Sequence, residues 1–443
     1  MKKKLTRTIA LLLSILMLAS CAPGTPEANS NGPVMAIAAA PSMELQWPDE
    51  ESGSAEAAAR GANDFAFRFS SALLSEMDSS ENFVCSPYSV WLPLAALLNA
   101  TDESARPTLL EALGAAGLTA GDINAAASRM LFGLTASGMN KMNEEFGYET
   151  HDPLKIANAI FVDNDEALNP EFAQTFADYF LGAAINVDFA SPDAARAVNE
   201  WASDNTDGLI TDIIEEFDPE TVAAIANAIY FSDRWKWEFS EDQTTEDVFH
   251  APGGDTTASF MLREGDNQAY YEDDTLQAMP LTFTMGGGLA VLLPKDGDAA
   301  GLLKSLTSER FSEIMSGMEH KTGKLLLPRF EIAGETMNIR SALEALVVPL
   351  LDANAAVITG LLEGSEPLFI TDAVQKAMIK VDEKGTTAAA VTVMAMAGAG
   401  APEETVPFEM VCDRPFVFVL YGDTFDGGNQ VLFTGVVNRA DNR

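Results

Sequence analysis

The chain has 443 residues, 47% of them hydrophobic, and a formal net charge of −39. Nucleic acid would repel so acidic a chain, so nucleic-acid binding is not an expected function. The 3 cysteines and 3 histidines form neither H-E-x-x-H nor C-x-x-C patterns, which argues against a zinc site.

The N-terminus combines basic residues with an apolar run from Ile9 to Ala19 that ends directly before Ser20 and Cys21. The run is too short for a membrane-spanning helix, which needs about 20 residues. This pattern is typical of a bacterial lipoprotein signal peptide over residues 1–20. An ordinary signal peptide followed by an incidental cysteine is the alternative. We expect lipid on Cys21 to anchor the mature, extracellular protein to the outer face of a bacterial membrane.

Residues 21–60 contain recurring prolines among small and polar residues, without an apolar period. They are predicted to form a flexible linker after the lipidated cysteine. No second linker of this kind follows, so residues 61–443 are expected to form one large domain.

Apolar spacing predicts the elements of this domain in chain order. Continuous apolar runs predict strands over 154–163 and 222–232, in the middle of a sheet that is covered on both faces. Shorter strands are predicted over 269–272, 277–283, 288–294, 324–332, 377–382, 415–421 and 431–437. Helices are predicted over 64–77, 89–99, 108–114, 123–134, 171–181, 193–206 and 212–216, and near 299–317 and 338–346. This order indicates an α+β fold.

Residues that could carry enzymatic chemistry are scarce. Cys85 and Cys412 lie in apolar segments and are interpreted as buried small side chains rather than as a disulfide or a nucleophile. No G-x-S-x-G elbow or phosphate-binding loop occurs, and Gly286 to Gly288 is better explained as a hairpin turn. The chain is therefore expected to be neither an enzyme nor a cofactor-binding protein.

The most unusual segment begins at Gly385, where thirty residues without helical periodicity lead to Arg414. A loop of this length inside a compact domain is usually functional or disordered. Its first half contains mainly small and β-branched residues, which could slide between two strands of a sheet without obstruction.

Several motifs, in the right order, resemble the serpin family of protease inhibitors. The segment Val381–Thr386 resembles the serpin proximal hinge, and Val411–Val417 resembles the C-terminal signature. Further segments match upstream and at the end of the domain: Asn82–Ser89, Ile156–Phe161, Ala226–Phe231 and Gly435–Asn438. The resemblance covers roughly residues 62–439. It implies the serpin fold, with three β-sheets, about nine helices and an exposed reactive-centre loop.

The resemblance also implies a function. An inhibitory serpin is a suicide substrate for extracellular serine proteases, and its cleaved loop inserts into the central sheet as a new strand. The expected hinge residues carry no proline and, after Lys384, no charge: Glu383, Gly385, Thr386, Ala388, Ala389 and Ala390. This composition favours insertion. The alternative is a non-inhibitory protein of the same fold that serves as a surface binding or adhesion module.

Other site residues follow from the same resemblance. Ser86, Ser89 and Asn227 match the shutter, a polar network beneath the strands that must part, and Gln375 stands where a histidine is usual. Trp235 matches the breach, where insertion begins. The resemblance further implies a monomer that forms a covalent acyl complex with its protease.

The scissile bond is assigned by counting along the loop. Seventeen residues counted from Glu383 end on Ala399, which favours the bond between Ala399 and Gly400, whereas counting back from Phe416 ends near Glu404. Small side chains dominate this stretch, and no Lys or Arg occurs between Lys384 and Arg414. An elastase-like protease is therefore the expected target.

Overall fold

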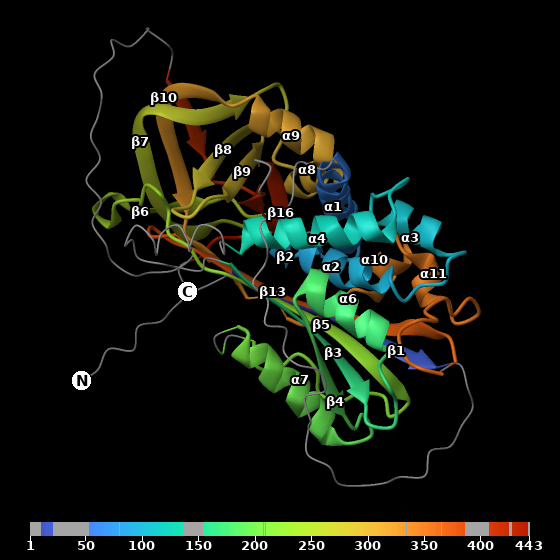
Figure 1. Ribbon diagram of the computed structural model, residues 1–443. Helices are drawn as coiled ribbons and strands as arrows, with labels where there is room; N and C mark the ends of the chain where they lie inside the picture. The colour runs from blue at the N-terminus through green and yellow to red at the C-terminus, as the bar shows by residue number, and fades with distance from the viewer. Residues whose placement is uncertain are drawn as a thin grey trace, which may run out of the picture.

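The computed structural model describes residues 10–20, 53–78, 80–135, 154–206, 208, 210–333, 335–364, 366–385, 407–424 and 428–441. Within these residues the chain forms a seven-stranded and a nine-stranded β-sheet, with helices packed around them (Figure 1).

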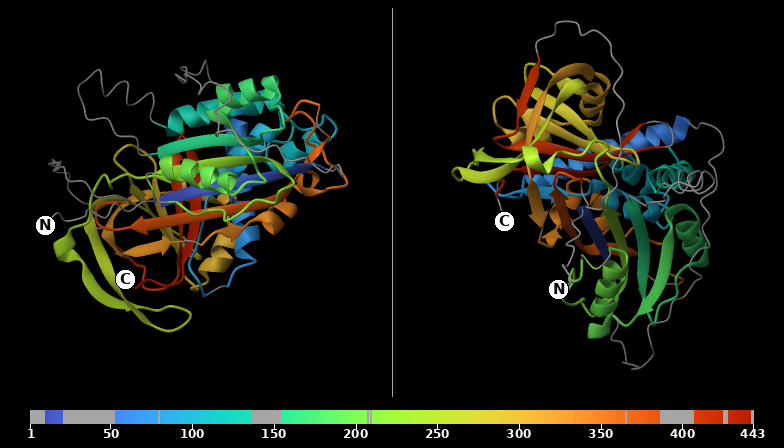
Figure 2. Two further views of the ribbon diagram at one scale, coloured as in Figure 1. Left: turned by 90° about the horizontal axis from the view of Figure 1, so that it is seen from below. Right: turned by 90° about the vertical axis from the view of Figure 1, so that its left-hand side faces the viewer.

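The seven-stranded sheet has the strand order β11-β13-β1-β5-β3-β4, with β12 beside β13. Its strands are β1 (Ala10–Ser20), β3 (Leu154–Asp163), β4 (Gly182–Val187), β5 (Thr221–Phe231), β11 (Phe330–Ala333), β12 (Met337–Asn338) and β13 (Leu368–Val381). Strand β1 is antiparallel to both β5 and β13, so these two neighbours run parallel to each other. Figure 2 shows β1 in dark blue between them.

The nine-stranded sheet has the order β14-β10-β7-β8-β9-β15-β16-β2, with β6 beside β7. Its strands are β2 (Phe83–Cys85), β6 (Thr245–Phe249), β7 (Thr256–Glu272), β8 (Leu276–Thr282), β9 (Gly288–Pro294), β10 (Glu319–Pro328), β14 (Phe408–Val411), β15 (Phe416–Asp423) and β16 (Asn429–Val437). The long strand β7 pairs with β6 and β10 over most of its length, and with β8 only at Tyr271 and Glu272. It thus joins two smaller sheets, which together with the first make the expected three.

Ten α-helices lie in the described residues, close to the nine that were expected. They are α1 (Gly53–Leu74), α2 (Pro87–Leu97), α3 (Arg106–Ala112), α4 (Ala120–Leu134), α6 (Pro170–Phe180), α7 (Pro192–Asp204), α8 (Ala299–Ser305), α9 (Ser308–Ser316), α10 (Arg340–Glu344) and α11 (Val348–Leu351). A single 3-10 turn, η1, spans Glu241–Gln243. Figure 1 shows α6 and α7 on opposite faces of the strands β3 to β5.

Strand β5 shows why the runs of apolar residues are continuous. Its residues alternate between two hydrophobic clusters, so that Ile225 and Ile229 join the cluster that contains α2 and α4. Ala226 and Ala228 face the second cluster, which Val198 of α7 also joins. Because both faces of the strand are covered, no polar face is needed.

Three helices begin by the same local device, a polar N-cap followed by proline. The side chains of Ser86, Asn169 and Ser191 each accept a hydrogen bond from a backbone N–H in the first turn. Proline suits the next position because the N–H that it lacks would have no partner in the helix.

The predicted strands over 154–163 and 222–232 are confirmed by β3 and β5, and the glycine hairpin is confirmed between β8 and β9. The helix predicted over 212–216 is wrong. The backbone N–H groups of Ile213 and Ile214 donate to the side chain of Asn199, so this segment lies along α7 without forming a helix. Helix α1 begins at Gly53, before the expected domain boundary at residue 61.

Several strands were not expected. In β7 a few buried residues near its start are followed by a stretch from Leu262 to Ala269 in which every residue is exposed or half-buried, so no long apolar run marks the strand. The short strands β4, β6 and β14 were also missed. Strand β1 falls within the run that was interpreted as part of a signal peptide. In the part of the chain described here, no helix is long and apolar enough to cross a membrane.

Candidate functional site: the hinge and the central slot

Strand β13 ends at Val381 in a tight turn that starts the long loop. The backbone N–H of Asp382 donates to the carbonyl of Gly385 at 3.1 Å, and the N–H of Gly385 donates back at 3.3 Å. On its other side Gly385 forms an antiparallel bridge with Arg234, just beyond the end of β5. Gly385 therefore lies between the ends of β13 and β5.

Only glycine fits this position. The φ angle of Gly385 is 132°, a conformation that other residues rarely adopt. A Cβ atom added there would lie 2.4 Å from the carbonyl oxygen of Asp233. The sequence predicts Gly385 as a hinge residue, and the geometry gives the physical reason.

Glu383 is held in place by an ion pair in which its own carboxylate is buried and the partner Arg329 is exposed. Its carboxylate, 4% exposed, accepts from Arg329 Nη2 at 2.6 Å and from Arg329 Nε at 2.8 Å. Thr244 Oγ1 donates to the same carboxylate. Burial alone would raise the pKa of Glu383, but the hydrogen bonds from Arg329 and Thr244 outweigh it and lower the pKa below the ordinary value. Neither Arg329 nor Thr244 was predicted.

Trp235 fixes the backbone of the same turn. Its indole Nε1 donates to the carbonyl of Asp382 at 2.9 Å, and its backbone N–H donates to that of Lys384 at 3.0 Å. The ring is 2% exposed and stacks on Phe283 at 4.7 Å between centroids. Trp235, which the resemblance assigns to the breach, therefore lies against the turn that starts the long loop.

Ser86, Ser89 and Gln375 form one network beneath the sheet. The amide Nε2 of Gln375 donates to the carbonyl of Ser86 at 2.9 Å and to Ser89 Oγ at 3.3 Å, and its Oε1 accepts from the N–H of Ser86. All three residues are fully buried. Gln375 thus uses both its donor and its acceptor, in the position where a histidine was expected.

Asn227 belongs to a separate network. It lies on the other side of the slot, the space between β5 and β13 that β1 occupies. Its Nδ2 donates to Asn158 Oδ1 at 2.7 Å, and Asn158 in turn donates to the carbonyl of Phe180. The buried Oδ1 of Asn227 accepts no hydrogen bond from the described residues. Strand β1 lies between the two networks, because Ser14 is the register partner of both Asn227 and Gln375. The four predicted shutter residues therefore surround one level of the sheet without all bonding to one another.

The remaining predicted residues fall outside the described part of the chain. These are the loop residues Thr386, Ala388, Ala389, Ala390, Ala399 and Gly400, and the lipidation residue Cys21. Cys85 and Cys412 are free and buried, which confirms their interpretation. Burial raises the pKa of Cys85 to about 11, although Thr434 and Ser70 oppose this, so the thiol is protonated at neutral pH. Among the described residues no cluster of His, Cys, Asp or Glu is arranged to hold a metal ion.

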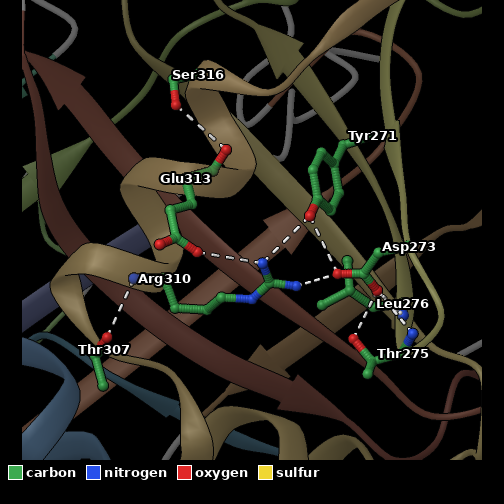
Figure 3. Close-up of polar contacts among 8 residues, drawn as sticks. All are labelled: Tyr271, Asp273, Thr275, Leu276, Thr307, Arg310, Glu313 and Ser316. Carbon is green, nitrogen blue, oxygen red and sulfur yellow. Dashed lines mark hydrogen bonds and ion pairs between the residues drawn. The ribbon is translucent and has the colours of Figure 1, made fainter.

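A second polar cluster lies away from the hinge and fastens helix α9 to the turn between β7 and β8 (Figure 3). Arg310 of α9 forms an ion pair with Asp273 and donates to the hydroxyl of Tyr271 at 3.2 Å. Asp273 also accepts from Thr275 and from the N–H of Leu276. Burial opposes ionisation of Asp273, but these hydrogen bonds hold its pKa well below the usual range. The hydrogen bonds and the ion pair of Asp273 described above all join parts of the fold to one another, which indicates a structural role.

Comparison with protein families finds a match over residues 60–440 to the model of the serpins, described as serine protease inhibitors. An uncharacterised serpin-like protein of Thermococcus kodakarensis is 32% identical over 277 residues, which cover 60% of this chain and 63% of that protein. Antichymotrypsin-2 of Bombyx mori is 31% identical and covers 80% of this chain and 91% of its own. The chain spans less than two thirds of some of its relatives, for example 64% of alpha-1-antitrypsin 1-1 of Mus musculus.

Solved structures give the same picture of the fold. The native state of the thermophilic serpin tengpin superposes with a TM-score of 0.71 at 22% identity, and covers 89% of this chain and 96% of its own. The Arabidopsis serpin AtSerpin1, in its native stressed conformation, has a TM-score of 0.73 at 22% identity, over 88% of this chain and 99% of that one. The predicted serpin fold is therefore confirmed.

Proposed function

Because the chain belongs to the serpin family, whose members are generally non-enzymatic protease inhibitors, we propose that it is a suicide-substrate inhibitor of extracellular serine proteases. Relatives whose names refer to trypsin and chymotrypsin support a serine protease as the target class. Inhibition requires that the loop after Gly385 enters the seven-stranded sheet once it is cut.

The observation that carries this proposal is the position of Gly385 at the end of a slot one strand wide. The slot between β5 and β13 accepts a strand antiparallel to both, as β1 demonstrates. Gly385 already pairs with Asp382 on one side and with Arg234 on the other. A chain that continues from Gly385 in this direction enters the slot without any change of pairing.

These two bridges also support one register for the proposed insertion. If pairing continued residue by residue from either bridge, an inserted Ala389 would lie opposite both Met378 of β13 and Tyr230 of β5. The two neighbours therefore agree on one register. Because side chains alternate between faces, the even-numbered loop residues would face the cluster that contains α2: Thr386, Ala388, Ala390, Thr392, Met394 and Met396.

The chemistry begins at the Ala399–Gly400 bond. The serine oxygen of the protease attacks the carbonyl carbon of Ala399, the peptide bond breaks, and the amine of Gly400 leaves with a proton from the protease histidine. Insertion then pulls the acyl-enzyme away before water attacks the ester. Distortion of the oxyanion hole and the catalytic residues stalls deacylation, so the protease remains covalently bound.

The loop composition selects the protease. Met396, Ala397 and Ala399 suit a shallow primary pocket, whereas a trypsin-like pocket needs a Lys or Arg that this part of the loop lacks. We therefore propose an elastase-like target. The net charge of −39 would speed encounter with a cationic protease at low ionic strength.

We further propose that the protein acts at the cell surface, held there by lipid on Cys21 after removal of residues 1–20. A metabolic label such as an alkyne fatty acid should appear on the expressed protein and should be absent from Cys21→Ala. Label retained by that variant would exclude Cys21 as the attachment site.

The proposed inhibition is tested with elastase, chymotrypsin and trypsin, denaturing electrophoresis and mass spectrometry of the released peptide. We expect a denaturant-resistant complex with elastase, a peptide that begins at Gly400, and little complex with trypsin. Thr386→Arg should convert the inhibitor into a substrate, because insertion would bury an unpaired charge. Wild-type stoichiometry for Thr386→Arg would rule out the insertion mechanism. For the chain that lacks residues 1–20, cleavage without any complex would favour the alternative of a surface binding or adhesion protein.

A further inference from the structure

The segment that fills the slot in this structure is the chain's own N-terminus. Strand β1 pairs with β13 from Leu11 to Ser20, opposite Met378 to Leu368. It pairs with β5 from Ala10 to Ala19, opposite Phe231 to Thr221. These ladders extend over nearly the whole of β5, so the slot is closed along its length.

Strand β1 occupies the positions that the bridges of Gly385 would assign to an inserted reactive loop. Leu11 lies opposite Met378 and Tyr230, the two residues that the bridges of Gly385 assign to Ala389. The same counting assigns Thr392 to the position of Ser14. An inserted loop would also run in the same direction as β1, because β1 is antiparallel to β5 and β13 and both bridges of Gly385 are antiparallel as well. Occupation by one therefore excludes the other.

The centre of the slot is polar, and the sequences of both segments are compatible with it. Asn227 and Gln375 are fully buried amides on either side of it, and Asn227 Oδ1 still lacks a donor among the described residues. A polar residue is tolerated at this level better than elsewhere in the strand, because buried amides can be satisfied only by polar partners. Both segments carry a hydroxyl residue there, Ser14 and Thr392, and Ser14 is the only such residue between Ala10 and Ala19.

We propose that residues 10–20 are an internal plug: in the unprocessed chain they occupy the slot as β1 and keep the reactive loop out. Removal of this segment opens the slot. Occupancy itself is independent of any inhibitory activity. The consequence, that the unprocessed chain is cleaved as a substrate and inhibits only after the segment is removed, rests on the proposed function.

The plug also constrains the order of folding and export. The apolar run is expected to act as a signal, but the same residues cannot serve as a signal while they form a central strand. A chain that folds before export would hide its signal and block its slot at once. It would therefore be neither anchored nor active as an inhibitor.

Cross-linking tests the occupancy directly in the full chain, with Cys21→Ser in all variants to prevent processing. Leu12→Cys is combined with Ile229→Cys, and Leu13→Cys with Ala228→Cys, since both are register pairs and one of the two is a close, non-hydrogen-bonded pair. The matched control combines Leu12→Cys with Ile225→Cys, which lies four residues, or about 13 Å, farther along β5. We expect a disulfide in at least one register pair and none in the control. Equal cross-linking in pair and control, or none in either pair, would overturn the proposal.

Displacement of the plug tests its consequence. Leu16→Asp places a charge between Ala373 and Ile225, which both belong to the interior cluster. Thr6→Asp adds the same charge outside β1. Amide exchange of β5 and β13 should be at least tenfold faster in Leu16→Asp than in Thr6→Asp, and only Leu16→Asp should form the elastase complex.

The two readouts separate the two hypotheses. Equal exchange in both variants would refute the plug, whatever the inhibition data show. Faster exchange in Leu16→Asp without an elastase complex would support the plug and refute the proposed inhibition. A complex formed equally well by Thr6→Asp would show that the loop enters despite β1, which overturns the proposal.

Discussion

Strands β9 and β15 in the nine-stranded sheet are apolar on both faces, whereas the middle of the seven-stranded sheet holds the buried amides of Asn158, Asn227 and Gln375. A sheet with an apolar centre gains nothing by opening, because its strands lose contacts that no other segment replaces. The polar centre beside the slot can exchange one partner strand for another. The nine-stranded sheet is therefore expected to be a fixed scaffold, and the seven-stranded sheet is expected to be the part that changes.

The largest expected effect follows from cutting the loop. In the chain from which residues 1–20 have been removed, cleavage at Ala399–Gly400 should let the loop join the seven-stranded sheet and raise the thermal midpoint by tens of degrees, since the proposed mechanism requires a kinetically trapped native form. Calorimetry of the intact and cleaved forms measures this. An unchanged midpoint after confirmed cleavage would mean that the two sheets do not differ in this way.

A core truncation in the nine-stranded sheet should cause a large loss of stability, and this loss should be equal in the intact and the cleaved protein. Phe418 is fully buried in β15 and packs against Phe330. Phe418→Ala should lower the free energy of unfolding by about 3–5 kcal/mol. The intact and cleaved proteins should lose similar amounts in calorimetry, with the exposed Val248→Ala as control. A loss confined to the intact form would show that β15 takes part in the change.

The ion pair between Glu383 and Arg329 should contribute less to stability than Phe418 does, and its contribution should depend on pH. Glu383→Gln removes a charge that Arg329 holds, which should cost about 2 kcal/mol at pH 7. The pKa of Glu383 in the folded protein is below its ordinary value of 4.5. Its stabilising contribution is therefore complete above pH 4.5 and is lost as the pH falls below that value.

Denaturant unfolding between pH 3 and 7 checks this, with Glu241→Gln at the exposed pair with Lys384 as control. The gap between wild type and Glu383→Gln should close toward the acid end of this range. A gap that is independent of pH would show that Glu383 acts by packing rather than by charge.

The smallest effect is expected at the second ion pair. Asp273 and Arg310 are partly exposed, so solvent screens them and Asp273→Asn should cost about 1 kcal/mol. The pKa of Asp273 also lies below its ordinary value of 3.8, so this contribution persists to lower pH than that of Glu383. Since this ion pair fastens α9 to the nine-stranded sheet, the loss of stability should be the same before and after loop cleavage.

The sequence predicted best what depends on apolar runs and on motif order. The strands β3 and β5 were visible because each is covered on both faces, and Ser86, Ser89 and Gln375 were located by the resemblance to serpins. Arg329 was not predicted, because a single arginine between two strands carries no sign of the distant carboxylate that it binds. Strand β1 could not be predicted, because an apolar run of this length is typical of both a signal peptide and a buried strand.

Gly385 has a consequence for protein engineering. Its backbone is fixed on both sides by Asp382 and Arg234, so the boundary between the invariant framework and the exchangeable bait falls at a single residue. A bait sequence from another inhibitor should be grafted directly after it, and its length should be adjusted only toward the C-terminal end. Grafts that keep this junction would inherit the alignment between β5 and β13, whereas grafts that move it by one residue would turn every side chain to the opposite face of the sheet.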